Sequence, residues 1–77
     1  MVPEVVDGWI VMPYGGHDTA VVEIGVGNPP IWQYAYLDWR EGERIAKVRL
    51  PEEFPTGRTH VQLRMAGHLV YGSKLLV

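Results

Sequence analysis

The chain of 77 residues contains no cysteine. This absence excludes a disulfide framework, a thiolate metal site and a cysteine nucleophile. The chain also has no long apolar run. Every apolar run is much shorter than the roughly 20 residues that a helix needs to span a membrane. A core built from so short a chain gives only a few kcal/mol of net stability, so we expect a larger assembly to help stabilise it.

Concentrated positive charge is absent too. The formal net charge is −2, and residues of both signs are scattered along the chain. Proteins that bind nucleic acids concentrate Lys and Arg where these side chains can follow a phosphate backbone. The histidines His17, His60 and His68 show none of the short spacings that are typical of zinc ligands. We therefore predict no nucleic-acid partner, no metal site and no cofactor.

Motifs for catalysis are equally scarce. Ser73 is the only serine, and no Gly-x-Ser-x-Gly elbow surrounds it. Thr59 and His60 are adjacent in a predicted strand, so their side chains point to opposite faces and cannot act as nucleophile and base. A domain of this size also has little room for a cleft that buries a substrate. We predict that the protein is not an enzyme.

Alternating hydrophobicity is the strongest positive signal. From Arg58 to Met65, apolar residues alternate with Arg, His and Gln, which is typical of a half-buried β-strand. Other runs of this kind are separated by Gly or Pro about every ten residues, and no segment has a helical period. The chain thus predicts a single all-β domain over residues 1–77, a small antiparallel β-sandwich of roughly six to seven strands. We expect strands at 9–12, 19–27, 31–39, 44–50, 58–65 and 68–77.

The same alternation predicts the core. We expect Val22, Ile24, Val61 and Leu63 to be among the most buried residues, on two strands that face each other across the sandwich. The segment 31–39 is ambiguous, because Trp32, Tyr34 and Tyr36 share one side and Gln33 lies on the other. If the aromatic side faced water, Gln33 would be buried without an evident partner, so we expect the aromatic side chains to face inward. The alternative is an exposed aromatic platform that binds sugar rings.

Three segments together resemble immunoglobulin-like and fibronectin type III-like modules. Val22-x-Ile24-x-Val26-x-x-Pro29 is similar to the second strand of a fibronectin type III module, with Val26 where those modules usually have Trp. Tyr34-x-Tyr36 is similar to the third strand. Leu50 to Leu63, with Pro55-Thr56-Gly57 between them, is similar to the corner and penultimate strand. The resemblance implies an immunoglobulin-like sandwich, a fold that serves many functions and selects none.

Candidate contact residues follow from their residue type and position. Loops and strand ends of a rigid sandwich are accessible, and Tyr, Trp and Arg contribute most to interface energy. The apolar segments Val2–Val6 and Leu75–Val77 would be covered by a neighbouring subunit, which includes self-association, or a partner strand would pair with the last edge. We predict that a protein partner is contacted by Tyr14, His17, Trp39, Arg40, Arg58, His60 and Arg64.

These observations favour a non-catalytic structural or interaction module that acts in a larger assembly. The form we expect first is a small virion protein, such as a phage capsid-decoration or tail accessory subunit. The alternatives are an excised immunoglobulin-like module of a bacterial surface or multi-domain protein, and a carbohydrate-binding module. With no signal peptide in the chain, we expect a virion or cytoplasmic location if the chain is full length.

Overall fold

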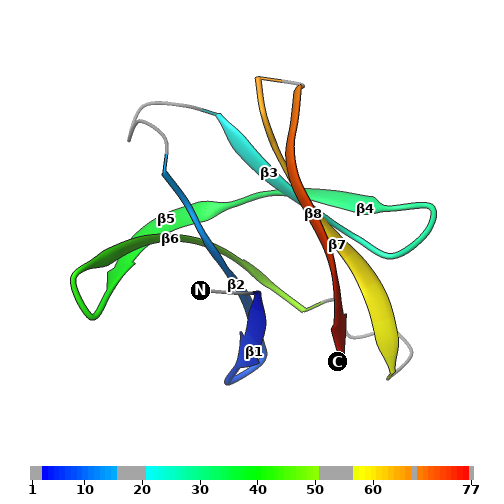
Figure 1. Ribbon diagram of the computed structural model, residues 1–77, viewed down its shortest axis with the longest axis horizontal. Helices are drawn as coiled ribbons and strands as arrows, with labels where there is room; N and C mark the ends of the chain where they lie inside the picture. Colours follow the sequence, from blue (N-terminus) through cyan, green and yellow to red (C-terminus); the bar gives the residue numbers. More distant parts are fainter. Residues whose placement is uncertain (1–2, 16–20, 51–56, 67, 77) are drawn as a thin grey trace.

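The protein is built from two antiparallel sheets. The computed structural model describes residues 3–15, 21–50, 57–66 and 68–76. Figure 1 shows the described strands arranged in two layers, and no helix occurs among these residues. The all-β prediction is therefore confirmed, and the arrangement is that of a small β-sandwich. The strands are β1 (Glu4–Val6), β2 (Trp9–Pro13), β3 (Val22–Val26), β4 (Ile31–Tyr34), β5 (Tyr36–Arg40), β6 (Glu43–Arg49), β7 (Arg58–Met65) and β8 (His68–Leu76).

Each sheet contains four strands. Their order is β1-β2-β6-β5 in one sheet and β4-β3-β7-β8 in the other. Two of the hairpins turn on a residue pair with positive φ, Asp7-Gly8 and Glu41-Gly42. Such pairs favour the two-residue turns whose twist matches that of the strands. In Figure 1, β2 crosses its partner β6 at a steep angle, so this sheet is strongly twisted.

The predicted single strand at 31–39 is wrong, because the chain changes sheets at Ala35. Up to Tyr34 the segment pairs with β3, and from Tyr36 it pairs with β6. At the crossing, the Ala35 amide donates a hydrogen bond to the Val22 carbonyl at 2.9 Å. This division and the short strand β1 explain why the structure has eight described strands, more than the six or seven expected.

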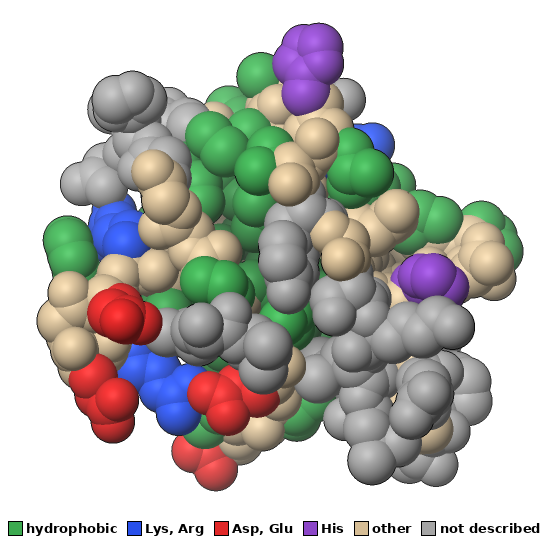
Figure 2. Space-filling view, in the orientation of Figure 1, with side chains coloured by type: hydrophobic (Ala, Val, Ile, Leu, Met, Phe, Trp, Pro, Cys, Tyr) green, Lys and Arg blue, Asp and Glu red, His purple; other side chains and the backbone are tan. Residues whose placement is uncertain are grey.

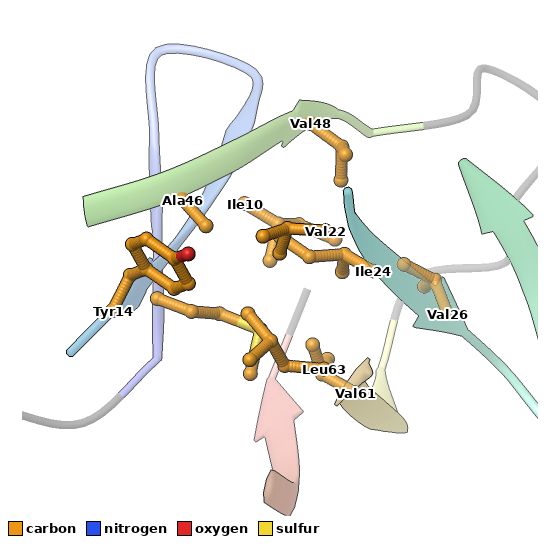
Figure 3. Packing of buried hydrophobic residues seen from close by; sticks show 10 residues of the cluster. Ile10, Tyr14, Val22, Ile24, Val26, Ala46, Val48, Val61 and Leu63 are labelled. Carbon is orange, nitrogen blue, oxygen red and sulfur yellow. The ribbon is translucent and has the colours of Figure 1, made fainter. Parts of the chain in front are cut away.

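The core lies between the two central strands of each sheet. The predicted core residues Val22, Ile24, Val61 and Leu63 are all at most 3% exposed, so their burial is confirmed. The prediction that their strands face each other across the sandwich is wrong. β3 and β7 are neighbours in one sheet, and the opposite layer comes from β2 and β6. The buried cluster in Figure 3 comprises Ile10, Met12, Tyr14, Val22, Ile24, Val26, Ala46, Val48, Val61 and Leu63.

Tyr14 is part of this core, contrary to its prediction as a contact residue. It is 4% exposed and belongs to the buried cluster with Ala46 and Ile10 (Figure 3). Its amide donates a 3.1 Å hydrogen bond to the Arg44 carbonyl, which continues the pairing of β2 with β6 beyond Pro13. A small domain needs large side chains to bury enough area, and the tyrosine ring fills this end of the sandwich.

Candidate functional site

The outer face of the sheet β4-β3-β7-β8 carries the most specific arrangement of side chains; we call it the β7 face. Because Ile24 and Leu63 point into the core, alternation turns their neighbours on β3 and β7 outward. The cross-strand register then places Trp32 beside Gly25, and Tyr34 beside Glu23. The β7 face comprises Val21, Glu23, Gly25, Trp32, Tyr34, His60, Gln62, Arg64, Leu69 and Val70.

Trp32 lies flat across the backbone of Gly25. A Cβ added at Gly25 would come within 2.8–2.9 Å of three atoms of the indole ring, which is closer than real Cβ contacts. Position 25 therefore needs a residue without a side chain. The sequence signal was visible, since a glycine within a strand indicates close approach by another group. Here the approaching group is the indole of the neighbouring strand.

Arg64 covers the other face of the indole. Its Cζ lies 3.8 Å from the centroid of the Trp32 ring, well within the range of a cation–π contact. The Gly25 backbone packs so closely against one face of the indole that no space for a guanidinium is left there, so Arg64 takes the opposite face. Trp32 is thus held between the Gly25 backbone and the Arg64 guanidinium.

Glu23 fixes the orientation of Arg64. Arg64 Nε and Nη2 donate hydrogen bonds to the two carboxylate oxygens of Glu23, both at 3.1 Å. Bidentate pairing of this kind restricts the guanidinium to the carboxylate plane. The side chains are 31% and 21% exposed, so solvent screens this ion pair only in part. Glu23, Arg64 and Trp32 form one stack that links β3, β7 and β4.

The aromatic side chains of 31–39 face outward, so the prediction that they face inward is wrong. Tyr34 is 74% exposed. The partner that Gln33 was expected to lack exists, because its amide Nε2 donates to the Arg49 carbonyl at 3.2 Å. The three rings do not form one continuous surface, since Arg64 stacks on Trp32. Tyr34 and Tyr36 also belong to different sheets.

Exposed apolar side chains surround the stack. Leu69 is 62% exposed and pairs with Arg64, while Tyr34 pairs with Glu23 on the opposite side. A register shift between β7 and β8 leaves Val70 as an extra residue beside Leu69, and it is exposed as well. Val21 is exposed just before β3 begins. Figure 2 shows hydrophobic side chains gathered where β3 begins and β7 turns into β8.

The outer face of the other sheet contains a hollow of about 290 Å³. Arg40 on β5 forms an ion pair with Glu4 on β1, although these strands are the two edges of the sheet. The strong twist of the sheet brings these opposite corners together over its outer face. Val11 and Ile45 line the hollow and are only 4% exposed, so an apolar floor lies beneath a charged rim.

Trp9 forms one wall of this hollow. Lys47 Nζ and Arg49 Cζ lie 4.8 and 4.7 Å from the centroid of its ring. The ring of Tyr36 meets Trp9 edge-on, with centroids 5.8 Å apart at 78°. Two cations and a second aromatic ring thus pack around the indole of Trp9.

Asp38 and Asp7 are the two carboxylates that line the hollow, and Asp38 is paired with Lys47. It accepts a 2.9 Å hydrogen bond from Lys47 Nζ and one of 2.8 Å from the Trp39 amide. The hydrogen bond from Lys47, that from the Trp39 amide and the positive charges of Lys47 and Arg44 lower the pKa of Asp38. A carboxylate with a lowered pKa stays ionised at neutral pH and does not serve as a general acid.

The predicted contact residues do not form one site. Arg64 and His60 share the β7 face, where exposed His60 lines a shallow hollow of about 200 Å³ with Asn28, Pro30 and Gln62. Trp39 and Arg40 belong to the other sheet, where Arg44 lies 4.9 Å from the centroid of the exposed Trp39 ring. Arg58 begins β7, but its side chain lies outside the described part of the chain, as does the whole of His17.

Within the described ranges, no three His, Asp or Glu side chains converge as metal ligands. The described residues also include no helix long and apolar enough to cross a membrane. Comparison with protein-family models, with curated proteins and with solved structures gave no match. Residue geometry is therefore the basis for the function proposed below.

Proposed function

We propose that the protein is a non-catalytic interaction module of immunoglobulin-like type, which docks onto a protein partner through its β7 face within a larger assembly. The order of the strands supports the immunoglobulin-like part. Constant-type immunoglobulin domains have strands A-B-E-D in one sheet and C-F-G in the other. The order β1-β2-β6-β5 matches the first, and β3-β7-β8 matches the second, with β4 beside β3. In this correspondence Val22–Val26 is the third strand, whereas the sequence resemblance made it the second.

The observation that carries the docking function is the composition of the β7 face. Interface hot spots combine Trp, Tyr and Arg with a surrounding zone of apolar contacts. The Trp32–Arg64–Glu23 stack is a rigid centre of this kind, and Tyr34, Leu69 and Val70 are exposed around it. Because the stack is ordered before any partner binds, docking would cost little side-chain entropy.

A virion is the assembly we propose first, with the chain as a capsid-decoration or tail accessory subunit. The rigid β7 face and the absence of cysteine support this choice. A module of a bacterial surface or multi-domain protein would use the same face and is the alternative.

Site-specific photo-crosslinking tests the proposal. Tyr34 and Tyr36 are matched positions, since both are exposed tyrosines but they lie on different sheets. Each is replaced by a photoreactive phenylalanine analogue, and the protein is irradiated in its native assembly. We expect protein adducts from position 34 and few from position 36. Adducts from position 36 alone, or from neither position, would contradict docking through the β7 face.

A further inference from the structure

We infer that the partner on the β7 face is a second copy of this chain, packed face to face about a two-fold axis. The axis runs parallel to the strands, between β3 and β7. This inference rests on the proposed function, because it names the partner of the same face. The evidence for it is that, in each row of residues across the sheet, one half of the row is complementary to the other half.

One cross-strand row is complementary to itself. Across the four strands it reads Tyr34, Glu23, Arg64 and Leu69, that is apolar, acidic, basic and apolar. A two-fold axis between β3 and β7 exchanges the two halves of this row. Glu23 of each copy then meets Arg64 of the other, and Tyr34 meets Leu69. Every charge faces its opposite and every apolar side chain faces another.

The next row brings the indole of each copy against Gln62 of the other. It reads Trp32, Gly25, Gln62 and Gly72 from β4 to β8. The indole of Trp32 lies over Gly25, so it occupies the position on β3 that the rotation places opposite Gln62. Gly72 has no side chain and comes opposite the β4 position from which the indole has turned toward β3, so neither copy obstructs the other there.

A third row, which contains Val21 and Ala66, is also complementary under this rotation. The Ala66 amide donates a 3.2 Å hydrogen bond to the Val21 carbonyl, so these residues are neighbours across β3 and β7. The rotation places exposed Val21 against the small side chain of Ala66. A face-to-face contact of this type is isologous and closes as a dimer.

The molecule is large enough for such a contact. Its accessible surface is 5067 Å². A stable interface buries roughly 800 Å² on each partner. The Glu23 and Arg64 charges are already paired within one copy, so association would join two neutral pairs into a network of four charges.

Charge reversal with mixing tests the inference on the purified chain, by sedimentation equilibrium over a wide concentration range. We expect the parent to show a monomer–dimer equilibrium. Glu23→Arg makes the charged centre wholly positive and Arg64→Glu makes it wholly negative, so each should weaken self-association about tenfold or more. An equimolar mixture should regain association close to that of the parent. The matched reversals Asp38→Arg and Lys47→Glu, on the other sheet, should leave it unchanged.

Folding is checked by a cooperative thermal melt of each variant. Leu69→Glu provides a second variant, because Leu69 is exposed and lies outside the stack. It should weaken self-association while the fold stays intact. A parent that stays monomeric, or a mixture that does not associate, would overturn the second copy as partner. If position 34 then still crosslinks to a different protein, the proposed docking function stands; if it gives no adduct, both ideas fail.

Discussion

Arg64 covers the outer face of Trp32, with its Cζ 3.8 Å from the ring centroid, while the inner face of the same ring lies on Gly25. The indole is therefore held on both faces although it lies on the solvent side of the sheet. Glu23 locks the guanidinium from the strand between them. This relationship makes one area of the surface rigid, and it leads to the first prediction.

Gly25→Ala should destabilise the fold by about 1–3 kcal/mol, because the added methyl group overlaps the indole and must displace it. Urea unfolding measures the change. Gly72→Ala is the matched control on an edge strand of the same sheet. A Cβ there would meet only Gln62 Cγ at an ordinary 3.8 Å, so we expect little change. Equal effects of the two substitutions would show that Trp32 does not pack on Gly25.

Leu63→Ala should cost about 2–5 kcal/mol, because Leu63 is buried in the core and the substitution leaves a cavity. A domain of this length has roughly 4–12 kcal/mol of total stability, so the substitution removes a large share of it and should lower the melting temperature markedly. Leu69→Ala, on the neighbouring strand, should change stability by less than about 0.5 kcal/mol. A melting temperature of Leu63→Ala close to that of the parent would contradict the core described above.

Much of the fold follows from the sequence because alternation is a local property. The burial of Ile24 and Leu63 depends on near neighbours in the sequence, and the structure confirms it. Which strand lies beside which is a non-local property. The alternation that buries Ile24 and Leu63 is the same whether their strands pair edge to edge or face each other across the core. Only the sheet order resolves this.

The candidate site was harder to predict for the same reason. Arg64 was expected on an outer face, and it lies there. Its partners Glu23 and Trp32 come from strands far away in the sequence, and cross-strand register alone brings them together. Tyr34 was misplaced because Gln33 finds its hydrogen-bond acceptor on the other sheet, at Arg49. No pattern within 31–39 contains that information.

The pH dependence of stability should include a contribution from Asp38. Its pKa is lowered in the folded state, chiefly by the hydrogen bond from Lys47. The contribution is therefore present above the ordinary aspartate pKa of about 3.9 and is lost as the pH falls through the lowered value. Asp38→Asn should melt below the parent at neutral pH, and the difference should shrink below about pH 4. A difference that stays constant down to pH 2 would contradict this pairing.

Arg40 should stabilise the fold mainly through the aliphatic part of its side chain. It reaches from one edge strand to Glu4 on the other, around a hollow with a buried apolar floor. Arg40→Ala should lower the melting temperature, because it opens Val11 and Ile45 to water. Arg40→Met keeps the stem and removes the charge, so it should retain most of the stability. If the methionine variant is as unstable as the alanine variant, the ion pair itself is the important interaction.

Hydroxyl-radical footprinting of the native assembly is the most direct test of docking through the β7 face. Reactivity of each exposed side chain is compared between the isolated chain and the assembly by mass spectrometry. We predict that Tyr34, Leu69 and Val70 lose most of their reactivity on assembly, while Tyr36 and Trp39 on the other sheet keep theirs. Protection of Tyr36 and Trp39 with Tyr34 and Leu69 still reactive would contradict the account.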